Sequence, residues 1–395
     1  MNKNGYFIEV DSYQGYKHNQ LVGGDVFLST KIKEENRIVS VLSDGLGSGI
    51  KASVLATLTA TMASRFIVNY IDIKKSAQII MKTLPVCKER KISYSTFSIV
   101  DIESDEHIRI IEYDNPPYIL LRESRIMDVD KNLIKVKPRR KKESQLYFSN
   151  FKAEMGDRII LLSDGVTQSG MGTPTMPLGW GISELRMFVE QIISENKTIS
   201  ARELAKRIVK KAMANDSFRC KDDITCGVIY FRKPRNIMVM TGPPISKDKD
   251  KDLAAMIDTF DGKKVICGGT TANIVARELK RDIKVNLRDI DPEIPPPASM
   301  HGIDLITEGI ITLGKVAELL EMGVKQDSQD GNAAQKLVYS LLNSDIVNFV
   351  VGTKINEVHQ DPNMPVELEI RRNVVKKIIK LLEEKYLKEA HLQFI

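Results

Sequence analysis

The sequence lacks long apolar runs, and no stretch approaches the roughly 18 uninterrupted apolar residues that a membrane span needs. Its first residues, MNKNGYFIEVDSYQ, lack the apolar core of a signal peptide. Cysteine is scarce as well, and the residues Cys87, Cys220, Cys226 and Cys267 show no Cys-x-x-Cys spacing. These absences argue against a membrane span, a disulfide framework and a zinc site, and they predict a cytoplasmic protein with reduced core thiols.

Charge of one sign is not concentrated either, because the formal net charge is only +6. The basic run KVKPRRKKE, residues 135–143, contains no aromatic residues that could stack on bases. It is typical of a solvated loop or hairpin, and we expect no nucleic-acid partner. A chain of 395 residues that is 42% hydrophobic is long enough for two domains with packed cores.

The chain up to residue 232 has the pattern of an α+β domain. Helical spacing predicts helices over residues 51–71, 182–194 and 200–215. In the first of these, Val54, Leu55, Leu58, Met62 and Phe66 define a face that we expect to pack on a sheet. Helices between long antiparallel strands predict a β-sandwich with helical layers outside. The strands are predicted at residues 6–13, 25–32, 37–43, 94–102, 107–113, 118–123, 157–163 and 224–231.

After the linker-like segment FRKPRN, residues 231–236, the pattern changes to strand, turn and helix. KKVICGGTTANIVARELKR and GIDLITEGIITLGKVAELLEMG are two examples. This alternation favours a mostly parallel sheet with helices on its faces. An amphipathic helix is expected over residues 366–388 at the end of the chain. We therefore expect an α+β domain over residues 1–232 and a smaller α/β domain over residues 236–395.

Acidic residues recur where the predicted strands of the first domain end or turn. They are Asp25 in GGDVF, Asp44 and Asp164 in two Ser-Asp-Gly sequences, and the neighbours Asp222 and Asp223 in KDDIT. Each one alone is explained by an ordinary turn or a helix cap. Buried together, carboxylates repel one another and need bound cations. Oxygen ligands without nearby histidine or cysteine favour Mg²⁺ or Mn²⁺, and two such ions can deprotonate a water and hold a phosphoryl group.

The order of these motifs resembles the metal-dependent protein serine/threonine phosphatases of type 2C, and among them the bacterial branch typified by the sporulation stage II E phosphatase. The similarity covers roughly residues 5–232, from Gly-Gly-Asp and Asp-Gly-x-Gly-x-Gly through EYDNPPYILLR and GDRIILLSDGVTQS to Asp-Asp-Ile-Thr. The resemblance implies an α-β-β-α sandwich with two Mn²⁺ or Mg²⁺ ions. It also implies hydrolysis of phosphoserine or phosphothreonine on a signalling protein by a metal-bridging hydroxide.

The resemblance also implies a role for each matching residue. Asp44 would bridge the two ions, and the carbonyl of Gly45 would complete the second site. Asp164 and Asp222 would hold the first ion. Asp25 would act on the side of the second ion, partly through bound water.

Other positions are less well defined. Asp223 should point the other way from its neighbour and either support a ligand or serve a third ion. Relatives place a histidine two or four residues after the bridging aspartate, where this chain has Leu46 and Ser48, so the acid that protonates the leaving oxygen is unassigned. The segment before Gly-Gly-Asp has no arginine to hold phosphate. Lys17 and His18 are candidate substitutes there, although surface positions are the better explanation for both.

The turn CGGTTAN in the second domain places backbone amides at a helix N-terminus, where an anion such as phosphate is favoured. A plain strand-to-helix turn has the same sequence. If a ligand binds this domain, we expect it at Gly268, Gly269, Thr270 and Thr271, with Glu308 opposite. His301 and His359 are isolated, so no second active site is predicted.

Two functions follow from these patterns. One is an active phosphatase with a regulatory second domain, and the presence of all the ligand carboxylates favours it. The other is a catalytically silent sensor with a phosphatase fold, whose second domain binds a small anionic ligand. For the enzyme, the resemblance implies a phosphorylated protein substrate and its cognate serine/threonine kinase system as partners. We expect no membrane partner and leave a homo-oligomer open.

Overall fold

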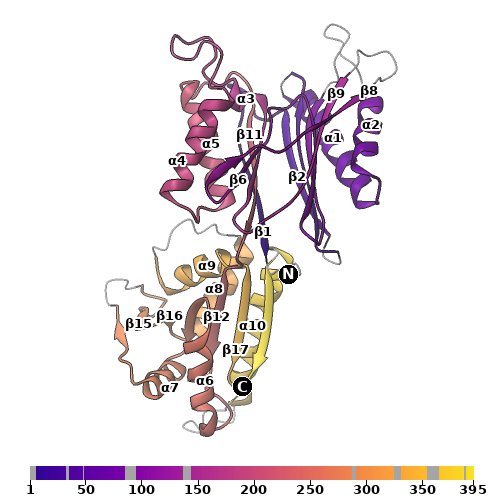
Figure 1. Cartoon of the computed structure of the whole chain (residues 1–395). Helices are drawn as coiled ribbons and strands as arrows, with labels where there is room; N and C mark the ends of the chain where they lie inside the picture. Colours follow the sequence, from indigo (N-terminus) through magenta and orange to yellow (C-terminus); the bar gives the residue numbers. More distant parts are fainter. Residues whose placement is uncertain are drawn as a thin grey trace. The chain divides into compact units, whose positions relative to one another are not determined.

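Two antiparallel sheets form the centre of the first unit in this computed structural model (Figure 1). One sheet has the order β1-β11-β10-β6-β7, from strands Phe7–Gly15, Ile224–Arg232, Arg158–Leu162, Ile119–Arg122 and Arg125–Met127. The other has the order β2-β3-β4-β5-β9-β8, from strands Asp25–Ile32, Arg37–Gly45, Ser95–Ile102, His107–Tyr113, Ser144–Lys152 and Asn132–Val136. Of these strands, β7, β8 and β9 were not predicted from the sequence.

The structure describes residues 6–32, 35–47, 49–84, 95–136, 144–286, 291–323, 331–353, 364–386 and 388–395. Ser48, Cys87 and His359 lie outside the described residues, as does most of the basic run at 135–143. Contacts divide the chain into two units, residues 1–233 and 234–395. No helix in the described part of the chain is long and apolar enough to cross a membrane.

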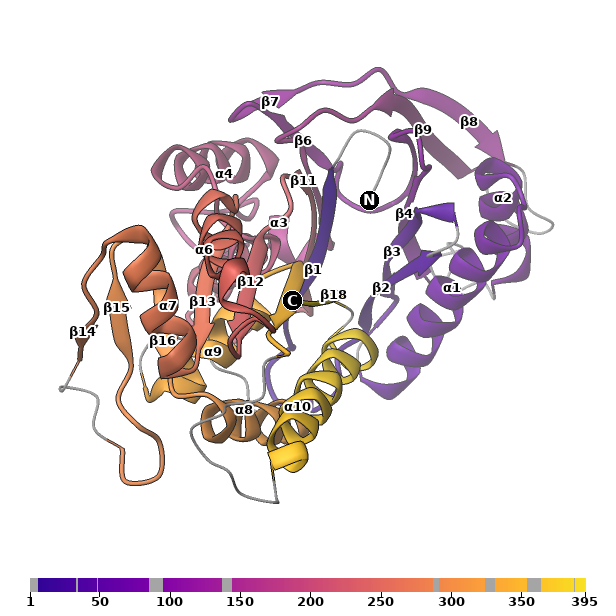
Figure 2. The ribbon, with the colours of Figure 1, turned by 90° about the horizontal axis from the view of Figure 1, so that it is seen from below.

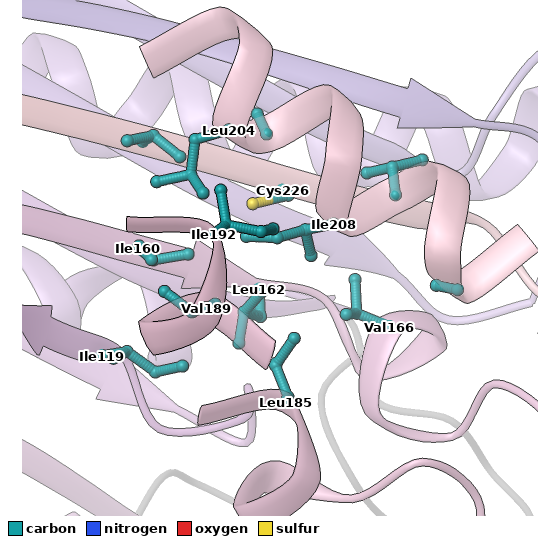
Figure 3. Close-up of a cluster of buried hydrophobic side chains, with 14 of the residues drawn as sticks. Ile119, Ile160, Leu162, Val166, Leu185, Val189, Ile192, Leu204, Ile208 and Cys226 are labelled. Atoms are coloured by element: carbon teal, nitrogen blue, oxygen red, sulfur yellow. The ribbon is translucent and has the colours of Figure 1, made fainter. Parts of the chain in front are cut away.

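Helices cover the outer face of each sheet in the first unit (Figure 2). Helices α1 (Ile50–Val68) and α2 (Ile73–Thr83) share a buried cluster with the second sheet, and α2 was not predicted. Helices α4 (Ile182–Glu195) and α5 (Ala201–Asn215) pack on the first sheet, as Figure 3 shows for Leu185, Val189, Ile192, Leu204 and Ile208. A further apolar cluster lies between the two sheets. The α-β-β-α sandwich predicted from the sequence is therefore confirmed.

Helix α1 corrects one part of the sequence prediction. Val54 is 59% exposed and Leu58 is 47% exposed, so the face that we expected to pack on the sheet lies partly in solvent. A Cβ atom added at Gly45 would lie 2.1 Å from the carbonyl oxygen of Ala52, which shows how closely the helix approaches β3. Only small side chains fit at this distance. The buried face accordingly consists mostly of small residues, Ala52, Ala56, Thr59, Ala60, Ala63 and Ser64, and the larger Ile67 is buried only in the last turn.

The second unit is a doubly wound α/β domain with five parallel strands in the order β16-β13-β12-β17-β18. Strands β14 and β15 extend one edge in the antiparallel sense. In the order of the sheet from β14, the strands are Lys284–Val285, Ala298–Met300, Ile303–Thr307, Lys263–Cys267, Asn236–Thr241, Ile346–Val351 and Glu389–Phe394. The mostly parallel sheet predicted for this part of the chain is present.

Helices cover both faces of this second sheet. A short 3₁₀ helix, η2 (Lys247–Lys249), leads into α6 (Asp250–Thr259), which shares one buried cluster with α7 (Gly269–Leu279). Helices α8 (Ile310–Met322), α9 (Ala333–Leu342) and α10 (Met364–Glu384) lie on the other face. The predicted final helix over 366–388 was partly wrong, because α10 ends at Glu384 and strand β18 closes the chain beside β17.

The described cysteines Cys220, Cys226 and Cys267 are buried and have free thiols. Burial raises the pKa of the Cys267 thiol to about 12, so this side chain is an unreactive member of the core.

Candidate metal centre

Four strand ends meet at one end of the sandwich and bring the acidic residues together. In the second sheet, Asp25 at the start of β2 pairs directly with Asp44 near the end of β3. Side chains of directly paired antiparallel residues lie on one face, about 4.5–5.5 Å apart at Cβ. In the first sheet, Asp164 begins the short helix α3 (Asp164–Thr167) just after β10, and Asp222 lies just before β11.

The charge environment of Asp44 shows that these acids lie within electrostatic range of one another. Burial raises its pKa to about 10, and the negative charges of Asp25, Asp164 and Asp222 add to the effect. A hydrogen bond shared between the carboxyl groups of Asp44 and Asp164 raises the pKa further. Without a cation, this site therefore favours a protonated Asp44.

Burial also raises the pKa of Asp25 and Asp222, as it does for Asp44. Burial raises the pKa of Asp25 to about 7, against hydrogen bonds from Thr225 and Ser163 that lower it. Burial also raises the pKa of Asp222, although the nearby positive charge of Lys17 partly opposes this. The neighbouring groups therefore do not fully stabilise the ionised form of these carboxyl groups.

Glycine allows the close approach of the elements that carry the acids. A Cβ at Gly165 would lie 2.1 Å from the carbonyl oxygen of Asp223, so the turn after Asp164 lies directly against the segment that leads into β11. A Cβ at Gly24 would lie 3.1 Å from Asp223 Oδ2 and 3.4 Å from the carbonyl oxygen of Gly45. The Gly45 carbonyl and the Asp223 carboxylate therefore both approach Gly24, the residue before Asp25.

Asp223 holds the loop between β1 and β2. Its Oδ1 accepts a hydrogen bond from the amide of Lys17 at 2.9 Å, and its Oδ2 accepts one from the amide of Gly24 at 2.6 Å. Both oxygens are thus used in fixing the loop that leads to Asp25. His18, in the same loop, is exposed, and its amide donates to the carbonyl of Cys220.

Several polar residues that surround the acids were not predicted from the sequence. Gln168 Nε2 donates to Asp164 Oδ2 at 2.9 Å. Gln14 Nε2 donates to the carbonyl of Asp25 and to Thr225 Oγ1, both at 3.1 Å, and so joins the two sheets. Thr225 could have been noticed from its place in Asp-Asp-Ile-Thr, whereas nothing in the sequence around Gln14 points to the site.

The residues fit a divalent cation with oxygen ligands. Asp25 is only 5% exposed, yet its Oδ2 has no hydrogen-bond partner. An orphaned carboxylate oxygen beside other buried acids is what a hard cation such as Mg²⁺ or Mn²⁺ would satisfy. Among the described residues, no group of three acidic, histidine or cysteine side chains is already arranged closely enough to hold a metal ion. We therefore expect the carboxylates to draw together when an ion binds.

The turn singled out in the second unit begins helix α7. Gly268 is its N-cap and has no side-chain cap, and the space around Gly269 is open. Thr271 is buried, and its hydroxyl has no partner. The carboxylate of Glu308 accepts hydrogen bonds from the amides of Ile311 and Thr312, so it already caps the neighbouring helix α8.

Comparison with known proteins adds three observations. The sequence profile of the family described as Stage II sporulation protein E (SpoIIE) matches residues 34–232. A search of curated proteins found no significant match. Many solved structures are similar, among them phosphatases from Bacillus subtilis.

One of these is the phosphatase domain of the cell fate determinant SpoIIE from Bacillus subtilis, at 18% identity and a TM-score of 0.44, covering 58% of this chain and 94% of that one. Another contains the PP2C phosphatase domain of the same protein and a fragment of its regulatory domain, at 20% identity and a TM-score of 0.48, covering 57% and 64%. RsbX in complex with magnesium is similar at 16% identity and a TM-score of 0.39, covering 58% and 97%.

Proposed function

Since the chain belongs to the Stage II sporulation protein E (SpoIIE) family and is a protein serine/threonine phosphatase, we propose that it removes phosphate from phosphoserine or phosphothreonine of a signalling protein. The partner that opposes it would be the kinase system that phosphorylates the same protein. The proposed cofactors are two Mn²⁺ or Mg²⁺ ions at the cluster of Asp25, Asp44, Asp164 and Asp222.

One observation carries this proposal: acids from four separate segments meet, and burial with mutual repulsion raises the pKa of Asp44 to about 10. A cluster that is electrostatically unfavourable by itself is explained when its function is to bind cations. Among the described residues, no lysine or arginine forms an ion pair with these acids. Lys17 acts on Asp222 only at longer range.

Each residue has a separate proposed role. Bound ions would supply Lewis acidity, which lowers the pKa of water and neutralises the oxygens of the phosphoryl group. Asp44 would lie between the two ions, with the Gly45 carbonyl on the side of the second. Asp164 and Asp222 would hold the first ion, and Asp25 would serve the second.

The surrounding residues would keep these ligands in position. Gln168 orients the Asp164 carboxylate through its hydrogen bond to Oδ2. Asp223 fixes the loop before Asp25 through the amides of Lys17 and Gly24. Such supporting hydrogen bonds set ligand orientation before an ion arrives.

We propose a regulatory role for the second unit, with a small anion at Gly268, Gly269, Thr270 and Thr271. The uncapped start of α7 and the unpartnered hydroxyl of Thr271 support this site. Glu308 would be a neighbour of the anion rather than a ligand, because its carboxylate caps α8. Titration of the full chain with inorganic phosphate by calorimetry tests the site, and Thr271→Val should weaken any binding.

Hydrolysis of p-nitrophenyl phosphate and of phosphoserine peptides, with and without Mn²⁺, tests the phosphatase proposal. We expect turnover that is lost on addition of EDTA and restored by Mn²⁺. Binding of Mn²⁺ without turnover of any of these substrates would contradict the proposal and identify a sensor.

A further inference from the structure

Gln14 and Thr225 lie directly opposite each other on the neighbouring strands β1 and β11. The side chains of such a pair share one face of the sheet. That face turns towards the second sheet, because Ile229 and Phe231 on the same side of β11 belong to the apolar cluster between the sheets. Thr225 is only 1% exposed, and Gln14 is half-buried. Both polar side chains therefore face the interior of the sandwich.

The packing of β2 on β11 brings Asp25 to this pair. A Cβ atom added at Gly227 would lie 2.3 Å from Cε2 of Phe27, so the phenyl ring packs directly on β11. Asp25 lies two residues before Phe27, and Thr225 lies two residues before Gly227. Because side chains alternate along a strand, Asp25 and Thr225 lie on the two faces that meet there.

The side-chain amide of Gln14 contacts both residues. Its Nε2 donates to the main-chain carbonyl of Asp25 and to Thr225 Oγ1, at 3.1 Å in each case. A carbonyl oxygen can only accept, so the NH₂ group of Gln14, which has two hydrogens, must face these atoms. Gln14 therefore connects the backbone of Asp25 in one sheet to the hydroxyl of Thr225 in the other.

The hydroxyl of Thr225 in turn holds the carboxylate of Asp25. A threonine hydroxyl has one hydrogen, and since Thr225 Oγ1 accepts from Gln14, that hydrogen is available to another group. The hydroxyls of Thr225 and Ser163 both form hydrogen bonds with the Asp25 carboxylate. Ser163 is itself fixed, because its Oγ accepts the amide of Thr225 at 2.9 Å. Among the described residues, Asp25 Oδ2 has no partner, so this oxygen is left for an ion.

We propose that Gln14 and Thr225 are positioning residues for Asp25. Gln14 fixes the backbone of Asp25 and orients the Thr225 hydroxyl, which holds the carboxylate with Oδ2 available to a divalent ion. This inference rests on the proposed function, because it assumes that an ion binds at Asp25. Asp25 begins β2, an edge strand that has a neighbour in its own sheet on one side only, so its support comes from the facing sheet.

Calorimetric titration of the full chain with Mn²⁺ tests the positioning. Hydrogen bonds to metal ligands typically change metal affinity by about 10- to 100-fold. We therefore expect Thr225→Val to weaken Mn²⁺ binding about tenfold or more, whereas Thr225→Ser, which keeps the hydroxyl, should stay within about threefold of the wild type. Gln14→Leu should also weaken binding, because it removes both hydrogen bonds.

Thr30→Val is the matched control. Thr30 lies on β2 as Asp25 does, five residues further along, and its hydroxyl is hydrogen-bonded to Ser64 Oγ at 2.9 Å. The substitution thus removes a threonine hydroxyl from the same strand without touching Asp25. We expect its Mn²⁺ affinity to equal that of the wild type.

Hydrolysis of p-nitrophenyl phosphate at increasing Mn²⁺ concentration gives a second measurement. In Thr225→Val and Gln14→Leu, the Mn²⁺ concentration for half-maximal turnover should rise by a larger factor than kcat at saturating Mn²⁺ falls. Wild-type Mn²⁺ affinity in both variants would overturn the positioning, and so would equal weakening in Thr225→Ser or Thr30→Val. Absence of Mn²⁺ binding by the wild type would instead refute the proposed function.

Discussion

Asp25 and Asp44 are directly paired residues of the antiparallel strands β2 and β3, so two carboxyl side chains share one face where the strands end. Like charges in such a pair destabilise a sheet. Here Asp164 adds a third carboxyl group from the facing sheet. The arrangement is therefore unfavourable for the metal-free fold, and this has measurable consequences.

The stability of the metal-free protein should fall as the pH rises above about 4, and this fall should continue beyond pH 7. The ordinary aspartate pKa of 3.8 is raised to about 7 in Asp25 and about 10 in Asp44, so the folded protein holds protons that the unfolded chain releases. The stabilisation by these two groups is complete below pH 4 and is lost gradually as the pH rises, up to about 7 for Asp25 and about 10 for Asp44. Denaturant unfolding in EDTA at several pH values measures this.

Bound Mn²⁺ should reverse that trend, because the ion replaces the protons. We expect the rise in Tm on adding Mn²⁺ to be larger at pH 7.5 than at pH 5. An equal rise at both values would show that the ion does not compete with protons at this cluster.

Asp44→Asn should separate activity from stability. We expect kcat to fall about a thousandfold or more. The free energy of unfolding of the metal-free variant at pH 7.5, measured with denaturant, should be higher than that of the wild type by roughly 1–2 kcal/mol. At this pH the buried Asp44 must take up a proton when the metal-free chain folds, because its pKa is raised to about 10. Asparagine is uncharged without a proton, so it avoids this cost, and it also removes the central ligand. Turnover close to wild type would refute the role of Asp44.

Asp101→Asn is the matched control for a buried carboxyl group of the same sheet. Asp101 is fully buried and paired with Arg37 at 2.8 Å and Arg109 at 2.6 Å. Breaking this buried network should cost roughly 3–5 kcal/mol, and kcat at a permissive temperature should remain within a few-fold of wild type. The two substitutions should thus change stability in opposite directions.

Gly165→Ala should weaken the centre without removing a ligand. The new Cβ would lie 2.1 Å from the carbonyl oxygen of Asp223 and would push apart the segments that carry Asp164 and Asp222. We expect a loss of about 1–3 kcal/mol in stability and weaker Mn²⁺ affinity by calorimetry. Gly314→Ala on α8, where the space is open, should instead stabilise by about 0.5–1 kcal/mol. Unchanged Mn²⁺ affinity in Gly165→Ala would speak against the proposed geometry.

Asp223→Ala should free the loop between β1 and β2. Hydrogen exchange at the amides of Lys17 and Gly24 should become much faster, because both lose their acceptor. Exchange at the Cys226 amide, inside strand β11, serves as the internal reference. Protection unchanged at the two loop amides would show that another group holds the loop.

The layers and the acidic residues could be predicted from the sequence because both depend on local patterns, the periodicity of apolar residues and the motifs at strand ends. An aspartate followed by glycine at the end of an apolar strand is visible for Asp44 and Asp164 alike. The orientation of α1 was not visible in this way. A helix with large apolar residues on one face and alanines on another could pack on the sheet through either face. The close approach of Ala52 to Gly45 shows that the alanine face packs on the sheet.

Long-range contacts explain the other differences between the sequence predictions and the structure. Gln14 reaches Asp25 and Thr225 only after the two sheets have assembled, so its place near the site has no local signal. The helix predicted up to residue 388 runs past the end of α10 at Glu384, and the short strand β18, Glu389–Phe394, was not predicted because it forms only by pairing with β17. The use of Glu308 as a cap for α8 depends on backbone geometry rather than on the motif.

Crystals of the full chain grown with Mn²⁺ and measured at the manganese absorption edge would show whether the four acids share two ions. We expect two anomalous peaks among Asp25, Asp44, Asp164 and Asp222, with the carboxylate oxygens and the Gly45 carbonyl within coordination distance. Absence of manganese at these four carboxylates, with the ion bound elsewhere or not at all, would contradict this expectation.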